Sequence, residues 1–186
     1  MEIKNDLNVK YIDFSERYLD AVVSLSEERI GTIDKHRIFL SDCKLAVDAD
    51  DGHLLGFLLS HTTDTPSLAK EMRLTTDELE EVVEMDNLLY VVDTFVVQKN
   101  AEKNYLATEL VRQGIDHAQN SGCHSAWSPL WIKKNGFIPS KNLMERLGFS
   151  YFKTAPMRLF YNRPDFRCID CGGWCTCDDA IYYKIL

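Results

Sequence analysis

One stretch of ten residues, 88–97, limits the folds open to this chain more than any other. Its side chains are mainly apolar, β-branched or aromatic. An apolar run of this length is typical of a central strand buried on both faces of a sheet. We therefore expect an α/β protein in which helices cover both sides of this strand.

The segments around this strand alternate between strand-like and helix-like patterns. Asp51-Gly52 separates two apolar runs, 44–47 and 54–59, which predicts a hairpin. Residues 63–70 read as a loop, and Thr75 with Glu78 matches a capping box for a helix ending near residue 85.

The second half of the chain continues this alternation. A polar stretch at 98–104 precedes an amphipathic helix that ends at Ser121-Gly122, and residues 123–127 form the next strand. A helix then begins at Pro139 or Ser140 and ends at Gly148. Residues 149–161 and 180–186 are the last two strands. The order predicts a mixed sheet of six to seven strands in one domain, 1–186, with an insertion at 63–87 and a cysteine-rich loop at 162–179.

Charge and hydropathy exclude two classes of partner. The formal net charge is −8 and no basic stripe is present, so nucleic acid is not expected as a ligand. No apolar run approaches the roughly 20 residues needed to cross a membrane, and the first six residues are mainly polar and lack the apolar core of a signal peptide. We expect a cytoplasmic protein.

Four of the six cysteines lie within ten residues, in the pattern C-x2-C-x3-C-x-C. They are Cys168, Cys171, Cys175 and Cys177. In a cytosolic chain such clustering indicates a metal before it indicates disulfides, and four thiolates suit a closed tetrahedral zinc site of structural type. An iron–sulfur cluster, redox disulfides and sharing of a metal across a homodimer are the alternatives.

Two local signals add to the element order. Residues 142–149 read Asn-Leu-Met-Glu-Arg-Leu-Gly-Phe, and the strand at 88–97 is followed by a polar loop and an amphipathic helix. Together they resemble the GCN5-related N-acetyltransferase (GNAT) family, in which a helix stops at Leu-Gly-Phe. The resemblance implies an acetyl-CoA-dependent N-acetyltransferase whose acceptor is the primary amine of a small molecule or of a protein.

The same resemblance implies a set of cofactor-binding residues. The backbone of Phe95, Val96 and Val97 would pair with the pantetheine arm, and a backbone N–H near Val96 or Val97 would polarise the thioester. The phosphates would meet the start of the following helix. The cofactor-binding residues implied there are Lys103, Asn104, Tyr105, Leu106, Ala107 and Thr108, together with Ser140 and Asn142 from the next helix.

The phosphate loop departs from the family pattern Arg/Gln-x-x-Gly-x-Gly/Ala. Glu102 stands where the family has a residue that attracts phosphate, and its charge opposes binding. Tyr105 replaces a glycine that permits close backbone approach, so only Ala107 fits the pattern.

Asp93 is the candidate catalytic base because it lies within the apolar strand, where burial raises the pKa of a carboxyl group. A strand carboxylate that pairs with a neighbour is the alternative interpretation. Met144 stands where the family often carries a tyrosine acid, and Tyr151 is the candidate substitute, or else an aromatic residue packing on the sheet. A CoA-binding module without catalysis, or a metal or redox sensor, is the second functional hypothesis.

Overall fold

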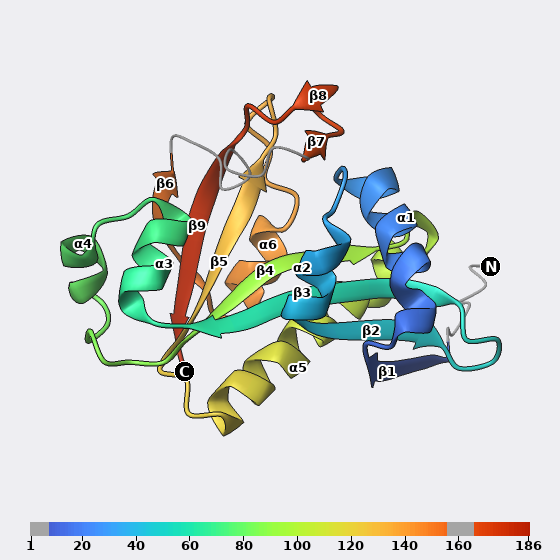
Figure 1. The fold of residues 1–186 in the computed structure, drawn as a ribbon, viewed down its shortest axis with the longest axis horizontal. Helices are drawn as coiled ribbons and strands as arrows, with labels where there is room; N and C mark the ends of the chain where they lie inside the picture. The colour runs from blue at the N-terminus through green and yellow to red at the C-terminus, as the bar shows by residue number, and fades with distance from the viewer. Residues whose placement is uncertain (1–7, 156–165) are drawn as a thin grey trace.

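The computed structural model describes residues 8–155 and 166–186 and places seven strands in one sheet (Figure 1). The strand order is β1-β2-β3-β4-β5-β9-β6, and every neighbouring pair is antiparallel except β4 and β5. The strands are β1 (Val9–Asp13), β2 (Asp42–Asp48), β3 (Leu54–Thr63), β4 (Leu89–Val97), β5 (Ser125–Ile132), β6 (Ser150–Ala155) and β9 (Asp178–Ile185).

Helices cover both faces of this sheet. One face carries α5 (Leu106–Asn120), which the 3₁₀ segment η2 (Lys99–Asn104) precedes, and α6 (Lys141–Arg146). The other face carries η1 (Glu16–Tyr18), α1 (Leu19–Arg29) and α2 (Lys35–Leu40) over the first strands, and α3 (Thr65–Met72) and α4 (Thr76–Glu80) over β4, β5 and β9. This arrangement explains the apolar character of β4, because side chains on both of its faces are buried.

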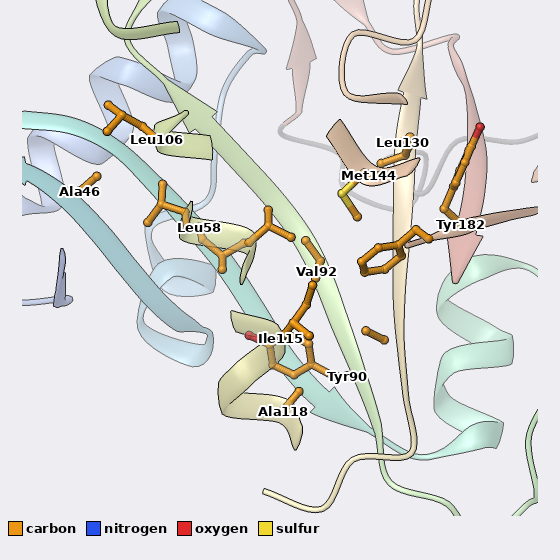
Figure 2. Packing of buried hydrophobic residues seen from close by; sticks show 14 of the residues in the cluster. Ala46, Leu58, Tyr90, Val92, Leu106, Ile115, Ala118, Leu130, Met144 and Tyr182 are labelled. Carbon is orange, nitrogen blue, oxygen red and sulfur yellow. The ribbon is translucent and has the colours of Figure 1, made fainter. Parts of the chain in front are cut away.

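The largest hydrophobic cluster lies between α5, α6 and the sheet. Tyr90 and Val92 of β4 meet Ile115 of α5, and Leu130 and Met144 extend the cluster toward α6 (Figure 2). Burial of this apolar surface stabilises the fold and positions the start of α5 beside the end of β4.

The two parallel strands separate along their length. β4 pairs with β5 only at Leu89–Ser125, Tyr90–Ala126 and Val91–Trp127. Ser128 Oγ donates a hydrogen bond of 2.8 Å to the Val92 carbonyl oxygen at the point where pairing ends. Pro129 follows and has no backbone N–H for a ladder hydrogen bond. A wedge-shaped gap in the sheet therefore opens toward the C-terminal end of β4.

The predicted hairpin, the capping box at Thr75 and the helix stop at Gly148 (φ 86°) are all confirmed. The prediction of a loop at 63–70 is wrong, because α3 occupies this segment. Asp64 caps α3 by accepting a hydrogen bond from the Ser67 N–H, and Leu68 and Met72 are buried.

The short helix α2 has no counterpart in the expected order. The strand expected at 149–161 is described as β6, and its residues 156–161 lie outside the described part of the chain.

A second, two-stranded sheet precedes β9. It pairs β7 (Arg167–Cys168) with β8 (Gly173–Trp174) and carries the clustered cysteines. Residues 162–165 of the predicted cysteine-rich loop lie outside the described residues. Within 8–155 and 166–186, no helix is long and apolar enough to cross a membrane.

Candidate active site

A cavity of about 550 Å³ lies where β4 and β5 part. This volume falls in the range of small-molecule sites, roughly 300–1,000 Å³. The cavity is lined by β4, β5, α1, α6, the start of α5 and the cysteine hairpin; its lining residues include Arg29, Asp93, Phe95, Val96, Val97, Glu102, Ala107, Trp131, Lys133, Ser140, Phe166, Cys168, Cys175 and Asp179.

The wall formed by β4 offers backbone groups to an extended ligand. Phe95, Val96 and Val97 line the cavity. One edge of β4 pairs with β3, where Val96 faces Phe57. Pairing of the other edge with β5 ends at Val91. An extended chain can therefore add to β4 as an extra strand would.

Asp93 lies at an irregularity in β4. Leu59 and Ser60 of β3 pair with Thr94 and Val92, so Asp93 is the additional residue of a β-bulge. It lines the cavity and is only 6% exposed. Arg37 of α2 forms an ion pair with its carboxylate, which is the pairing with a neighbour that the alternative interpretation of this residue describes.

The start of α5 faces the same cavity. Tyr105, the N-cap, has φ 57° and ψ 14°, and its side chain does not cap the helix. A glycine adopts a left-handed conformation without strain, so the glycine that Tyr105 replaces in the family pattern would fit this backbone. The N–H groups of Leu106, Ala107 and Thr108 belong to the first helical turn, where an anion can bind.

The loop before α5 carries Glu102, which forms an ion pair with Arg29 at the end of α1. Both residues line the cavity. Lys103 and Asn104 belong to η2, and their side chains lie outside what the structure describes.

Residues of α6 divide between the cavity and the core. Ser140, which precedes α6, lines the cavity, whereas Asn142 is exposed and is not among the described lining residues. Met144 is fully buried beside Leu130, as Figure 2 shows, and has no group that could donate a proton.

Tyr151 lies on β6, outside the described lining of the cavity. Its residue exposure is 54%, its hydroxyl is 3.0 Å from Thr154 Oγ1, and its ring packs edge-on against Tyr182. The structure thus brings Asp93 to the cavity and leaves Tyr151 at the surface of the sheet.

The four clustered cysteines converge on one point. The Sγ atoms of Cys168, Cys171, Cys175 and Cys177 all lie within 4.8 Å of one another. Four sulfurs bound at the usual zinc–sulfur distance of about 2.3 Å would be separated by about 3.8 Å. The Thr176 backbone N–H also donates to Cys171 Sγ over 3.2 Å, as second-shell donors do in thiolate sites. The donor set therefore fits a tetrahedral metal.

The clustered cysteines differ in how easily they ionise. Burial raises the pKa of Cys177 to about 12 and also raises that of Cys175, and charge on neighbouring cysteines adds to both effects. Burial opposes charge on Cys171 as well, but hydrogen bonds from Thr176 lower its pKa to about 7. Four thiolates at this spacing require a bound cation to neutralise them.

The cysteine hairpin leads into β9 on one side of the gap between β4 and β5 and contacts the loop after α1 on the other side. Cys168 forms a β-bridge with Gly31, and the Ile169 N–H donates to the Ile30 carbonyl over 3.1 Å. Phe166, Cys168 and Cys175 face the cavity. The hairpin thus covers the cavity between β9 and the loop after α1.

The sequence model of the acetyltransferase (GNAT) family matches residues 8–149. The chain belongs to the acetyltransferase (GNAT) family. The predicted family, the mixed α/β fold and the enzyme class are confirmed, and membership supports acetyl-CoA-dependent acetylation in general.

Solved GNAT structures share the fold at low sequence identity. Arabidopsis thaliana NAA60 in complex with acetyl-CoA has a TM-score of 0.72 and 14% identity, over 96% of this chain and 98% of that one. The NatC complex bound to Gag peptide and CoA gives 0.68 and 14%, over 96% and 99%. The mosquito protein named arylalkylamine N-acetyltransferase like 5b gives 0.64 and 13%, over 96% and 100%. No curated protein sequence matches the chain.

Several residues that line this GNAT cavity, or contact its lining, were not predicted from the sequence. Arg37 belongs to α2, a helix that the sequence did not predict, and it pairs with Asp93. Arg29 is far from the cysteine hairpin along the chain, although the two lie close together in the fold. Asp179 lies in the buried strand β9 and lines the cavity. Its charge was the only feature of the sequence that could have indicated its place in the site. Pro129 within an apolar strand could have indicated the open edge of β5.

Proposed function

We propose that this GNAT protein transfers the acetyl group of acetyl-CoA to a primary amine. The observation that carries the proposal is the open edge of β4 inside a cavity that also contains Asp93 and the start of α5. NAA60 with acetyl-CoA and NatC with CoA and a peptide provide precedents for the cofactor in the same fold. The acceptor is an amine of a small molecule or of a protein.

The cofactor would lie along β4 and end at α5. The pantetheine arm pairs with the backbone of Phe95 to Val97, and a backbone N–H near Val96 or Val97 stabilises the oxyanion of the tetrahedral intermediate. The phosphates meet the N–H groups of Leu106, Ala107 and Thr108. Lys103, Asn104, Tyr105, Ser140 and Asn142 complete the proposed set of cofactor-binding residues.

Asp93 is the proposed catalytic base. It takes a proton from the acceptor ammonium, directly or through a water, and the neutral amine attacks the thioester carbonyl carbon. The carbon–nitrogen bond forms, the carbon–sulfur bond breaks, and the departing CoA thiolate receives a proton. Tyr151 stays the sequence-based candidate for that proton, since Met144 cannot supply it.

The cysteine cluster is proposed as a structural zinc site. Cys168, Cys171, Cys175 and Cys177 supply all four ligands, which leaves no open position for chemistry on the metal. Zinc bound there would hold the hairpin against the loop after α1. The cytoplasmic location stays a prediction from the sequence, as do a homodimer and the absence of nucleic-acid and membrane partners.

Native mass spectrometry with and without acetyl-CoA tests cofactor and metal together, and turnover over a panel of primary amines tests catalysis. Acetyl-CoA binding with acetylation of at least one amine is the expected result. Failure to bind acetyl-CoA at high micromolar concentration would sink the proposal.

Binding without turnover would favour the second function, a CoA-binding module. The buried Met144 in place of a proton donor and the acidic Glu102 in the phosphate loop are the observations that favour it. Dependence of oligomeric state or activity on metal removal, without CoA binding, would instead indicate a metal or redox sensor.

A further inference from the structure

The ion pair between Arg29 and Glu102 lies at the end of the cavity next to the start of α5. Both side chains line the cavity together with Val97 and Ala107. Glu102 comes from η2, the segment immediately before α5, whereas Arg29 is the last residue of α1 on the opposite face of the sheet. The pair therefore brings a guanidinium from a distant part of the sequence to the proposed phosphate site.

Two acidic residues near this end of the cavity oppose a phosphate. Glu102 carries the wrong sign, and Glu109 lies in the first turn of α5. Among the described residues that line the cavity, the cations are Arg29 and Lys133. Lys133 lies with its ammonium 5.1 Å from the ring centre of Trp131, on the β5 side, so Arg29 is the cation that reaches the loop before α5.

We propose that Arg29 binds the diphosphate of coenzyme A. It supplies the phosphate-attracting side chain that the loop lacks, because Glu102 stands at that position of the family pattern. A guanidinium has five N–H donors in a planar fork, so it can keep one hydrogen bond to Glu102 and present others to phosphate oxygens. This assignment rests on the proposed binding of acetyl-CoA.

The backbone that presents Arg29 is held in place by the cysteine hairpin. Thr32 N–H donates to the Arg167 carbonyl over 3.1 Å, and Ile169 N–H donates to the Ile30 carbonyl. A Cβ on Gly31 would lie 2.0 Å from the Arg167 carbonyl oxygen, so the two segments touch without room for a side chain. Arg29 is thus anchored directly next to this contact.

The first experiment compares wild type with Arg29→Ala by isothermal titration of CoA and by NMR titration of pantetheine, which lacks the phosphates. The variant should lose about 10- to 100-fold in CoA affinity, as expected for charged hydrogen bonds, and should bind pantetheine as wild type does. Dephospho-CoA, which retains the diphosphate, should show the same loss as CoA. Arg17→Ala is the matched control, because Arg17 contacts Tyr18 in η1 and is not among the described residues that line the cavity.

A double-mutant cycle separates phosphate binding from simple neutralisation of Glu102. Glu102→Gln alone should tighten CoA binding several-fold, because it removes a like charge and releases Arg29. If Arg29 only neutralised Glu102, the double variant Arg29→Ala with Glu102→Gln would match Glu102→Gln. We expect the double variant to bind CoA at least 10-fold more weakly than Glu102→Gln does.

Equal CoA affinity of wild type and Arg29→Ala would overturn the assignment, and so would a loss confined to the KM of the acceptor. Arg29→Lys keeps the charge without the fork and should give an intermediate CoA affinity, which provides a second test if Arg29→Ala folds poorly. If wild type itself bound no CoA, the proposed function would fail instead, so the two failures are distinguishable.

Discussion

Two walls of one cavity were built in different ways. The wall from residue 95 to residue 108 uses backbone: an open strand edge, a left-handed residue at Tyr105 and the first N–H groups of α5. The wall from Phe166 to Asp179 uses side chains, with four sulfurs gathered around one point. A backbone site tolerates side-chain change, whereas a thiolate site depends on each of its ligands.

Because a backbone site tolerates side-chain change, the phosphate loop can depart from its family pattern and keep its N–H groups. A metal site of four thiolates needs all four cysteines. Glu102 and Tyr105 alter the loop, yet Tyr105 keeps the left-handed geometry and Arg29 offsets the charge of Glu102. The largest effect of a substitution is expected at the side-chain wall.

Replacing a single thiolate should break the side-chain wall. Cys175→Ser should lose bound zinc and lower the free energy of unfolding by more than about 4 kcal/mol, because loss of a metal site is among the most damaging changes. Native mass spectrometry and chemical denaturation measure the two quantities. Cys123→Ala, at a buried cysteine outside the cluster, should keep the metal. A wild type free of metal after preparation without chelators would contradict the prediction.

Asp93→Asn should lower kcat by about 10²- to 10⁴-fold while acetyl-CoA still binds, because a base is lost and the strand edge is not. The Arg37 charge left behind would also destabilise the fold. Arg37→Met breaks the same ion pair but keeps the carboxylate. If both variants reduced kcat equally at matched folded fractions, Asp93 would have only a structural role.

Contact between the two walls can be tested at Gly31. Gly31→Ala should lower the free energy of unfolding by about 1–3 kcal/mol and weaken CoA binding, because a Cβ would collide with the Arg167 carbonyl. Gly122→Ala is the matched control: its φ is 77°, also left-handed, but its Cβ would meet nothing within 4 Å. Equal effects in the two variants would show that backbone strain alone is responsible.

The smallest effect is expected for the backbone wall. Tyr105→Gly should raise the free energy of unfolding by about 1 kcal/mol, because it relieves a left-handed non-glycine residue, and CoA affinity should not fall. Arg73→Gly provides the comparison, since Arg73 has φ 53° at the end of α3 far along the chain from the phosphate loop. A marked loss of CoA affinity in Tyr105→Gly would show that the tyrosine side chain itself binds the cofactor.

Local patterns predicted what depends on neighbouring residues. The apolar run of β4, the hairpin at Asp51-Gly52 and the capping box at Thr75 all formed as expected. The hairpin and the capping box are stabilised by contacts within a few residues, and the apolar run of β4 reflects burial on both of its faces. The segment at 63–70 was misread because its helix depends on burial of Leu68 and Met72. Partners such as Arg37 for Asp93 are set by packing of distant elements, which no local pattern contains.

The sequence alone determined the family, the strand at the centre of the sheet and the spacing of four cysteines. Only the tertiary structure decided that β4 and β5 separate after Val91, that Asp93 lies in a bulge beside Arg37, and that Arg29 meets Glu102. The physical reason is the distance along the chain over which each interaction acts. Propensity, periodicity and ligand spacing act along the chain, whereas the separation of strands and the pairing of buried charges depend on which elements pack together.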